Sequence, residues 1–148
     1  MKSEIQLSDS LYPAVPRVAV GAVVFHENRI LLVRRGQPPS LDTWAIPGGK
    51  VRLGETLQQA AEREILEETS LVIRAGKPVY TFDHVERDEK NRVRYHYVIV
   101  DLMADYVSGR IRPGDDVLDA RWMASTELAE YNLSPPTRAL LKNMFEFG

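Results

Sequence analysis

The chain has 148 residues, a formal net charge of −2 and no cysteine. A chain of this length suits one domain with a substantial core, so we expect a single domain over residues 1–148. The near-neutral charge provides no general attraction to nucleic acid polymers or anionic membranes, and the lack of cysteine excludes disulfides, thiol catalysis and thiolate metal sites.

The first 16 residues contain Pro13 and Pro16 and are expected to form an irregular lead-in. They lack a basic segment followed by an apolar one, and no apolar run in the chain approaches the roughly 18 residues of a membrane-spanning helix. Because cysteine is also absent, we expect a soluble, unprocessed protein in the reducing cytoplasm.

Residues 17–26 and 29–35 are rich in β-branched side chains and are predicted to form two strands joined by a turn at Glu27-Asn28. Residues 36–40 contain Gly, Pro and Ser, which favour a loop. In the next segment, Thr56 and Gln59 have the spacing of a capping box. A helix is therefore predicted from about Leu57 to Thr69.

The second half of the chain is predicted to contain three more strands and one helix. The strands are expected at residues 72–84, 93–104 and 118–123. The charged segment 86–92 is predicted to be a solvated hairpin loop, and it could instead border a substrate. The C-terminal helix is expected to open at Ser134-Pro135-Pro136 and to bury Leu140, Leu141 and Met144. Strands interrupted by two helices predict an α/β fold in which helices cover a sheet.

The predicted central helix carries Glu64, Glu67 and Glu68 at positions i, i+3 and i+4, so the three side chains point the same way. Like charges at this spacing destabilise a helix unless a cation joins them. Several hard oxygen ligands suit Mg²⁺ or Mn²⁺, which retain water and phosphate oxygens as further ligands. The pattern therefore predicts a metal platform for phosphate chemistry, and the alternative is a solvated acidic face.

Gly49, Glu55 and the run Arg63-Glu64-Ile65-Leu66-Glu67-Glu68 resemble the signature of the Nudix hydrolases, which cleave nucleoside diphosphates linked to another moiety. The preceding residues 44–49, Trp-Ala-Ile-Pro-Gly-Gly, are similar to the lead-in of that family. One position departs from the pattern, because Ser70 stands where the family has Gly. Ser at a helix end costs about 1 kcal/mol relative to Gly and removes no ligand. The resemblance implies an α/β/α Nudix sandwich with a mixed β-sheet.

Cleavage of a phosphoanhydride requires charge neutralisation and a placed water, and a divalent metal can supply both. Glu64, Glu67 and Glu68 are expected to hold the metal, and the resemblance adds the Gly48 carbonyl. Glu55 is either a ligand or supporting group, or a charge that favours the helix dipole. Adjacent to the carboxylates, Arg63 is expected to orient a ligand through an ion pair.

Asp116 is the candidate general base or further metal ligand, because several Nudix relatives have an acidic residue in a similar loop. A Pro-Gly-Asp turn also occurs for structural reasons, so both readings stay open for Asp115-Asp116. If Asp116 is not the base, Glu64 is the next candidate.

Arg34 and Arg35 end a strand that leads toward the Gly-Gly loop, and one of the two could clamp phosphate through a bidentate contact. Trp44 could stack on a base, or it could belong to the core. The three histidines, His26, His84 and His96, lack metal-ligand spacing and are interpreted as structural.

The leading hypothesis is a Mg²⁺-dependent Nudix pyrophosphohydrolase that acts on a small nucleoside diphosphate derivative, with ADP-ribose as the candidate substrate. A nucleoside triphosphate pyrophosphatase for damaged nucleotides and a non-catalytic nucleotide sensor are the alternatives. A nucleic acid decapping enzyme would need a basic track that this composition does not supply. Since family members often dimerise, a homodimer is an open expectation.

Overall fold

The computed structural model describes residues 10–38, 40–114 and 116–148. Its centre is a mixed sheet with the order β3-β2-β1-β6-β5, in which β4 also pairs with β1 and β7 also pairs with β2. Only the pairing of β1 with β6 is parallel among these strands. The strands are β1 (Arg17–His26), β2 (Arg29–Arg35), β3 (Trp44–Ala45), β4 (Gly48–Lys50), β5 (Val72–Arg87), β6 (Val93–Ser108) and β7 (Val117–Ala124).

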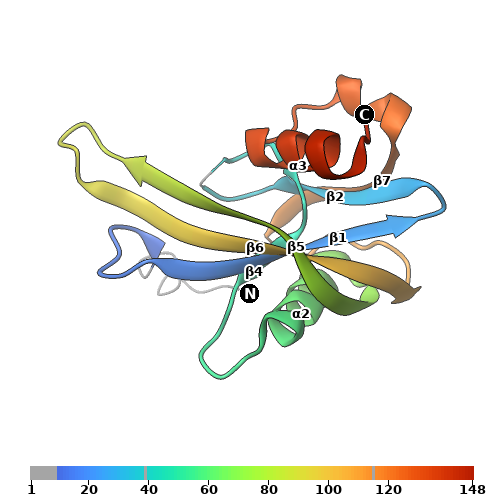
Figure 1. The fold of residues 1–148 in the computed structure, drawn as a ribbon, viewed down its shortest axis with the longest axis horizontal. Helices are drawn as coiled ribbons and strands as arrows, with labels where there is room; N and C mark the ends of the chain where they lie inside the picture. The colour runs from blue at the N-terminus through green and yellow to red at the C-terminus, as the bar shows by residue number, and fades with distance from the viewer. Residues whose placement is uncertain (1–9, 39, 115) are drawn as a thin grey trace.

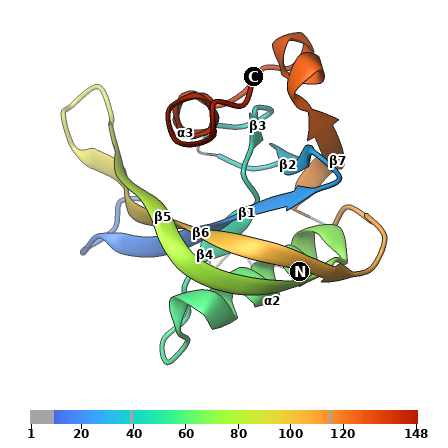
Figure 2. The same ribbon diagram turned by 45° about the vertical axis from the view of Figure 1, so that its right-hand side comes forward.

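Helices cover the two faces of this sheet. Helix α2 (Leu57–Thr69) lies on one side, and α3 (Pro135–Phe145) lies on the other with the short 3-10 helix η1 (Ser125–Glu130) beside it (Figure 1). The turned view keeps the same order of layers (Figure 2). The predicted α/β/α sandwich with a mixed sheet is therefore confirmed.

The predicted strands at residues 17–26 and 29–35 have the bounds of β1 and β2. Strands β5 and β6 each run further than expected, because their antiparallel pairing continues from Val72 opposite Ser108 to Arg87 opposite Val93. Part of the charged segment 86–92 is thus strand, and the turn itself is closed by the Asp88 carboxylate.

Three short elements were not predicted. Strands β3 and β4 have 2 and 3 residues, and η1 has 6. Elements of this length show no periodicity that a sequence pattern can reveal. They matter for the site, since β4 carries Gly48 and pairs with β1 through Gly21.

The predicted capping box begins α2 as expected. The Gln59 N–H donates to the Thr56 hydroxyl at 3.1 Å, and the Gln59 side chain accepts from the Thr56 N–H at 2.9 Å. At the other end, Ser70 adopts a left-handed conformation with φ of 66°. Its hydroxyl donates to the Arg112 carbonyl at 3.3 Å, which offsets part of the strain of a non-glycine residue there.

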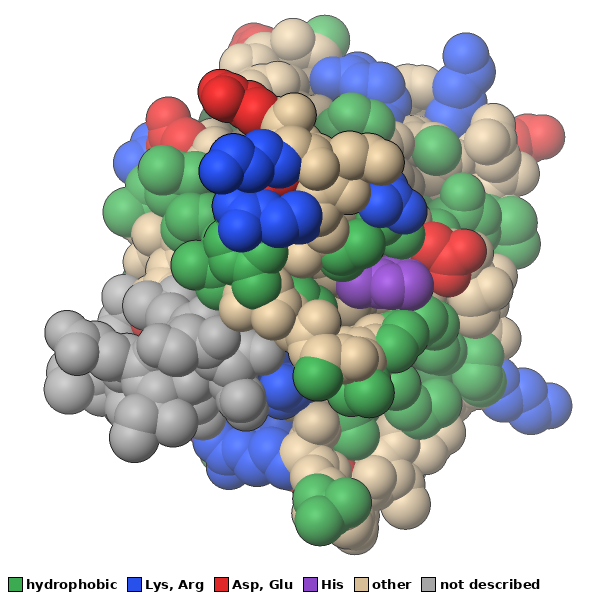
Figure 3. All heavy atoms as spheres, turned by 90° about the vertical axis from the view of Figure 1, so that its left-hand side faces the viewer, with side chains coloured by type: hydrophobic (Ala, Val, Ile, Leu, Met, Phe, Trp, Pro, Cys, Tyr) green, Lys and Arg blue, Asp and Glu red, His purple; other side chains and the backbone are tan. Residues whose placement is uncertain are grey.

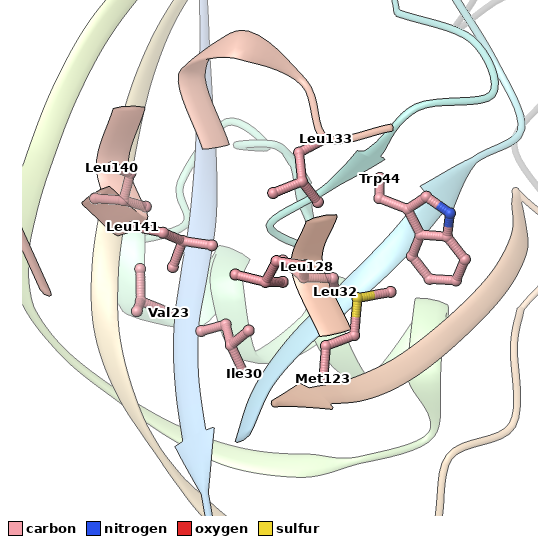
Figure 4. Packing of buried hydrophobic residues seen from close by; sticks show 9 residues of the cluster. All are labelled: Val23, Ile30, Leu32, Trp44, Met123, Leu128, Leu133, Leu140 and Leu141. Carbon is pink, nitrogen blue, oxygen red and sulfur yellow. The ribbon is translucent and has the colours of Figure 1, made fainter. Parts of the chain in front are cut away.

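The core on the α3 side combines residues from the sheet, η1 and α3 (Figure 4). Leu140 and Leu141 are fully buried there as predicted, whereas Met144 is 48% exposed, so its predicted burial is wrong. The helix is only 11 residues long, and Met144 stands in its last turn. The cluster is formed by Val23, Ile30, Leu32, Trp44, Met123, Leu128, Leu133, Leu140 and Leu141.

The expected lead-in falls partly outside the described residues, because residues 1–9 are not among them. Residues 11–16 form bends without helix or strand, and the Tyr12 N–H donates to the Arg94 carbonyl at 2.8 Å. In the part of the chain that the structure describes, no helix is both long and apolar enough to cross a membrane.

Candidate active site

Two of the three helix carboxylates are enclosed by a pair of glycines. Glu64 is 2% exposed and Glu68 is 8% exposed. A Cβ atom at Gly49 would lie 2.4 to 2.6 Å from the carboxyl atoms of Glu64, so only glycine allows this approach. The Gly48 N–H donates to Oε1 of Glu68 at 2.8 Å. The predicted Gly-Gly loop therefore lies directly against the acidic face of α2.

Arg63 connects the carboxylates of this cluster. Its guanidinium donates to both oxygens of Glu55, at 2.7 and 2.9 Å, and to Oε1 of Glu64 at 2.8 Å. A further bond at 3.0 Å reaches the Lys50 carbonyl, and Oε2 of Glu67 lies 3.5 Å from Nη1. The guanidinium is thus held in one orientation by α2, by the segment before it and by the end of β4.

Glu55 is occupied by these bonds. Its carboxylate accepts from Arg63 and also from the Arg52 N–H at 2.8 Å. The hydrogen bonds from the Arg63 side chain, supported by the Arg52 N–H, lower the pKa of Glu55 to about 2. The same pairing raises the pKa of Arg63. Of the two readings open for Glu55, this geometry favours a group that supports Arg63.

The chemistry of the donor set fits Mg²⁺, because α2 presents hard carboxylate oxygens on consecutive turns of one face. The positions of these carboxylates in the structure fit a bound metal ion less well than their chemistry does. Within the described ranges, no three His, Asp or Glu side chains converge closely enough to hold a metal ion. Arg63 lies between Glu64 and Glu67 and draws both carboxylates toward its guanidinium.

The loop that carries Asp116 is anchored to the end of α2. The Arg112 N–H donates to the Thr69 carbonyl and the Gly114 N–H donates to the Glu68 carbonyl, each at 2.8 Å. A Cβ atom at Gly114 would lie 2.1 Å from the Glu67 carbonyl oxygen. The structure therefore places this loop beside the acidic helix, while Asp115 lies outside the described residues.

Asp116 accepts a hydrogen bond from the Gln37 amide at 2.9 Å and faces a pocket of about 460 Å³. The polar lining of the pocket includes Gly48, Glu68 and Asp116. The lining also includes four ring-bearing residues of β5 and β6, namely Phe82, His84, Tyr95 and Tyr97. Polar and aromatic groups thus share one concave site, the arrangement expected for a ligand with a charged end and a flat end.

Of the three candidate substrate-binding residues, the structure places one in the pocket and two outside its lining. Arg35 lines the pocket, whereas Arg34 is half-exposed and its Nε lies 3.3 Å from Oδ1 of Asp42. Trp44 is 5% exposed, packs edge-on against Tyr131 and is absent from the pocket lining, so the core alternative describes it (Figure 4).

His84 and Asp101 are pocket residues that the sequence did not identify. His84 was interpreted as structural, but it lines the pocket, and its Nε2 is buried without a hydrogen-bond partner in the described residues. Asp101 is 4% exposed, and its burial raises its pKa to about 7. A single acidic residue inside the apolar run Val-Ile-Val-Asp-Leu is the signal that could have found Asp101.

Residues 15–144 match the NUDIX domain family. An ADP-ribose pyrophosphatase of Methanocaldococcus jannaschii is 33% identical over 107 residues, which cover 72% of this chain and 61% of that protein. An NAD-capped RNA hydrolase of Haemophilus influenzae is 27% identical, with 90% and 47% covered. The chain thus spans about half to three fifths of the length of these curated relatives.

Solved structures agree with the sequence match. A MutT NUDIX hydrolase from Burkholderia pseudomallei superposes with a TM-score of 0.71 at 32% identity, covering 86% of this chain and 97% of that one. The NUDIX domain of Shewanella oneidensis NrtR, crystallised with ADP ribose, superposes with a TM-score of 0.70 at 23% identity, covering 99% and 98%. From the family match over most of its length, the chain belongs to the NUDIX domain family.

Proposed function

We propose that this protein is a Mg²⁺-dependent pyrophosphohydrolase that cleaves a small nucleoside diphosphate derivative into a nucleoside monophosphate and a second phosphorylated product. The observation that carries the proposal is that one pocket is lined by Glu68 of the acidic helix, by Arg35 and Asp116, and by aromatic side chains of β5 and β6. Such a pocket has separate places for phosphates and for a flat ring.

Glu64, Glu67 and Glu68, with the Gly48 carbonyl, are the proposed metal-binding groups, and Mn²⁺ is the alternative ion. The metal would neutralise phosphate charge and lower the pKa of a bound water. Since Arg63 holds Glu64 and Glu67 in the structure, metal binding requires at least Glu67 to turn away from the guanidinium. Glu67 is the side chain free to do so, because it is 43% exposed.

The other residues act through charge and position. Arg63, fixed by Glu55, keeps the Glu64 carboxylate in place. Arg35 is the proposed phosphate-binding cation at the pocket wall. Asp116 is the proposed base that takes the proton from the attacking water, and Gln37 orients its carboxylate.

ADP-ribose is the proposed substrate class, since the Methanocaldococcus jannaschii relative is an ADP-ribose pyrophosphatase and the NrtR domain was crystallised with ADP ribose. On the face shown in Figure 3, the described basic and acidic side chains are interspersed with hydrophobic ones. An RNA polymer would favour a basic composition, whereas this chain has a formal net charge of −2, so a small nucleotide is the better fit. We also propose that the protein acts in the cytoplasm.

A substrate panel tests this proposal. ADP-ribose, other nucleotide sugars, dinucleoside polyphosphates and nucleoside triphosphates are incubated with the protein and Mg²⁺, and the products are resolved by chromatography. We expect AMP and ribose 5-phosphate from ADP-ribose. Selective hydrolysis of triphosphates would favour the alternative of a nucleoside triphosphate pyrophosphatase. Binding of ADP-ribose with no turnover of any compound would favour a nucleotide sensor.

A further inference from the structure

Asp101 is a buried acidic side chain that lines the pocket. It lies on β6, is 4% exposed and lines the cavity. Among the described residues it has no hydrogen bond or ion pair, and burial is the single cause that raises its pKa. A Cβ atom at Gly21 would lie 2.2 Å from Oδ1 of Asp101, so the neighbouring strand makes room for the carboxyl group. The carboxyl group therefore has space and a fixed position, and it lacks a partner.

A buried carboxyl group without a partner costs free energy, because it has lost its water and gained no hydrogen bond. No hydrogen bond or ion pair from the described residues recovers that cost, and the chain neighbours Val100 and Leu102 point to the opposite face of β6. A donor group on a bound ligand would recover it. The position therefore indicates ligand recognition more than stability.

The position of Asp101 in the pocket indicates which part of a ligand could donate a hydrogen bond to it. Gly21 pairs with Asp101 on one side and with Gly48 on the other, so Asp101 lies two strand spacings, roughly 10 Å, from the backbone of Gly48. Along β6, roughly at right angles to that direction, Tyr97 and Tyr95 are four and six residues away, or roughly 13 and 20 Å. Asp101 thus lies at a corner of the pocket lining, with Gly48 and the acidic helix reached across the strands and the tyrosines reached along β6.

A nucleotide has the same order of groups. Its phosphate is followed by a sugar with hydroxyl donors and then by a flat base. A carboxylate has two acceptor oxygens, which suit the two neighbouring hydroxyls of a ribose. The flat base suits the aromatic side chains beyond, which include Phe82 and Tyr97.

We propose that Asp101 accepts hydrogen bonds from the ribose hydroxyls of the nucleoside and makes the pocket selective for ribonucleotides over 2′-deoxyribonucleotides. This inference rests on the proposed function, because it takes the phosphate end of the pocket from that function. Beyond that function, it assigns a specificity-determining role to Asp101 on β6 and identifies ribose as the sugar that this residue recognises.

The test compares ADP-ribose with its analogue that lacks the 2′-hydroxyl of the adenosine ribose. For the unmodified protein, we expect kcat/KM to favour ADP-ribose by about 10- to 100-fold, the effect of hydrogen bonds to a charged group. Asp101→Asn should bring the ratio close to one, mainly by raising KM for ADP-ribose. Asp105→Asn is the matched control, since Asp105 lies on the same strand but is exposed, and it should leave the ratio unchanged.

A binding experiment separates failure of the inference from failure of the proposed function. AMP and 2′-deoxy-AMP are titrated calorimetrically into the protein, into Asp101→Asn and into Asp105→Asn, with folding checked by circular dichroism. Tighter binding of AMP that is lost only in Asp101→Asn supports the inference even if no compound is hydrolysed. Equal binding of AMP and 2′-deoxy-AMP by the unmodified protein, or an unchanged preference in Asp101→Asn, overturns it whether or not ADP-ribose is cleaved.

Discussion

Two groups of acidic residues in this protein have opposite surroundings. Glu55 and Glu64 are bound by Arg63, whereas Asp101 has no partner among the described residues. The pKa of Glu55 is lowered to about 2 by the Arg63 side chain, and that of Asp101 is raised to about 7 by burial. Arg63 stabilises the negative charge of the paired carboxylates within the fold. The charge of Asp101 would instead be stabilised by a ligand that binds in the pocket.

The largest effect is expected from the helix cluster. Glu67→Gln removes a proposed metal ligand and should lower turnover by about 100-fold while the fold stays intact. Glu62→Gln is the control, because Glu62 lies on the same helix and accepts a hydrogen bond from the Ala75 N–H, which a glutamine can also do. Steady-state kinetics measure the effect. A folded Glu67→Gln protein with near-normal turnover would contradict the metal role of the cluster.

The same cluster predicts a stability effect of the metal. Millimolar Mg²⁺ should raise the melting temperature, since a ligand that binds only the folded state stabilises it by mass action. Glu67→Gln should blunt the rise and Glu62→Gln should not. An unchanged melting curve in Mg²⁺, with and without ADP-ribose, would show that α2 does not bind the ion.

The loop residue Asp116 is expected to have the next largest effect. If it is the base, Asp116→Asn should slow the chemical step by at least about 100-fold and change substrate binding much less. Asp119→Asn provides the control, because Asp119 lies three residues further on and pairs with Arg121 outside the pocket lining. Single-turnover kinetics measure the step. Cleavage by Asp116→Asn at the unmodified rate would move the search for a base to Glu64.

Stability measured against pH tests the contrast between the two groups of acidic residues directly. The folded protein binds a proton at Asp101 more tightly than the unfolded chain does, so Asp101 costs stability as the pH rises from about 4 to about 7. Asp101→Asn should therefore stabilise the protein at pH 8, by on the order of 4 kcal/mol, and much less at pH 4.

Glu55 should show the opposite dependence. Its lowered pKa adds stability that is present above about pH 4.5 and is lost as the pH falls toward about 2. Glu55→Gln should thus destabilise the protein at pH 7 and have little effect near pH 2. Urea unfolding at several pH values measures both variants. The same pH dependence in the two variants would contradict the assigned roles of pairing and burial.

The smallest effect is expected at Ser70. Ser70→Gly relieves the left-handed strain but loses the hydroxyl bond to Arg112 and loosens the unfolded chain, so stability should change by less than about 1 kcal/mol. Turnover should not change. A large loss of activity would mean that this departure from the family pattern affects the Asp116 loop, which Arg112 joins to the helix.

Local signals predicted the parts of the fold that local forces determine. The β-branched runs gave the bounds of β1 and β2, and the capping box gave those of α2. The site was only partly predictable, because its remaining residues meet through long-range pairing. Asp101 faces the pocket because β6 pairs with β1 at Gly21, a register that no local pattern contains.

The sequence also could not show which of Arg34 and Arg35 lines the pocket. The pairing of β2 with β7 shifts register between these two residues, and the arginine after the shift lines the pocket. A bulge changes which side chain faces which way, and the sequence of β2 alone does not reveal it. Trp44 likewise belongs to the core because Leu133 and Tyr131, far along the chain, pack beside it.

The anchoring of Gly114 on the last turn of α2 has a consequence for how this protein tolerates changes of length. Main-chain hydrogen bonds at Arg112 and Gly114 fix the loop to the helix, and only one residue separates Gly114 from Asp116. Extra residues inserted before Arg112 can bulge into solvent without moving Asp116. A single residue inserted after Gly114 would shift the Asp116 carboxylate along the pocket wall. The length of the chain between Gly114 and Asp116 therefore determines where this carboxylate lies, whereas the length before Arg112 does not.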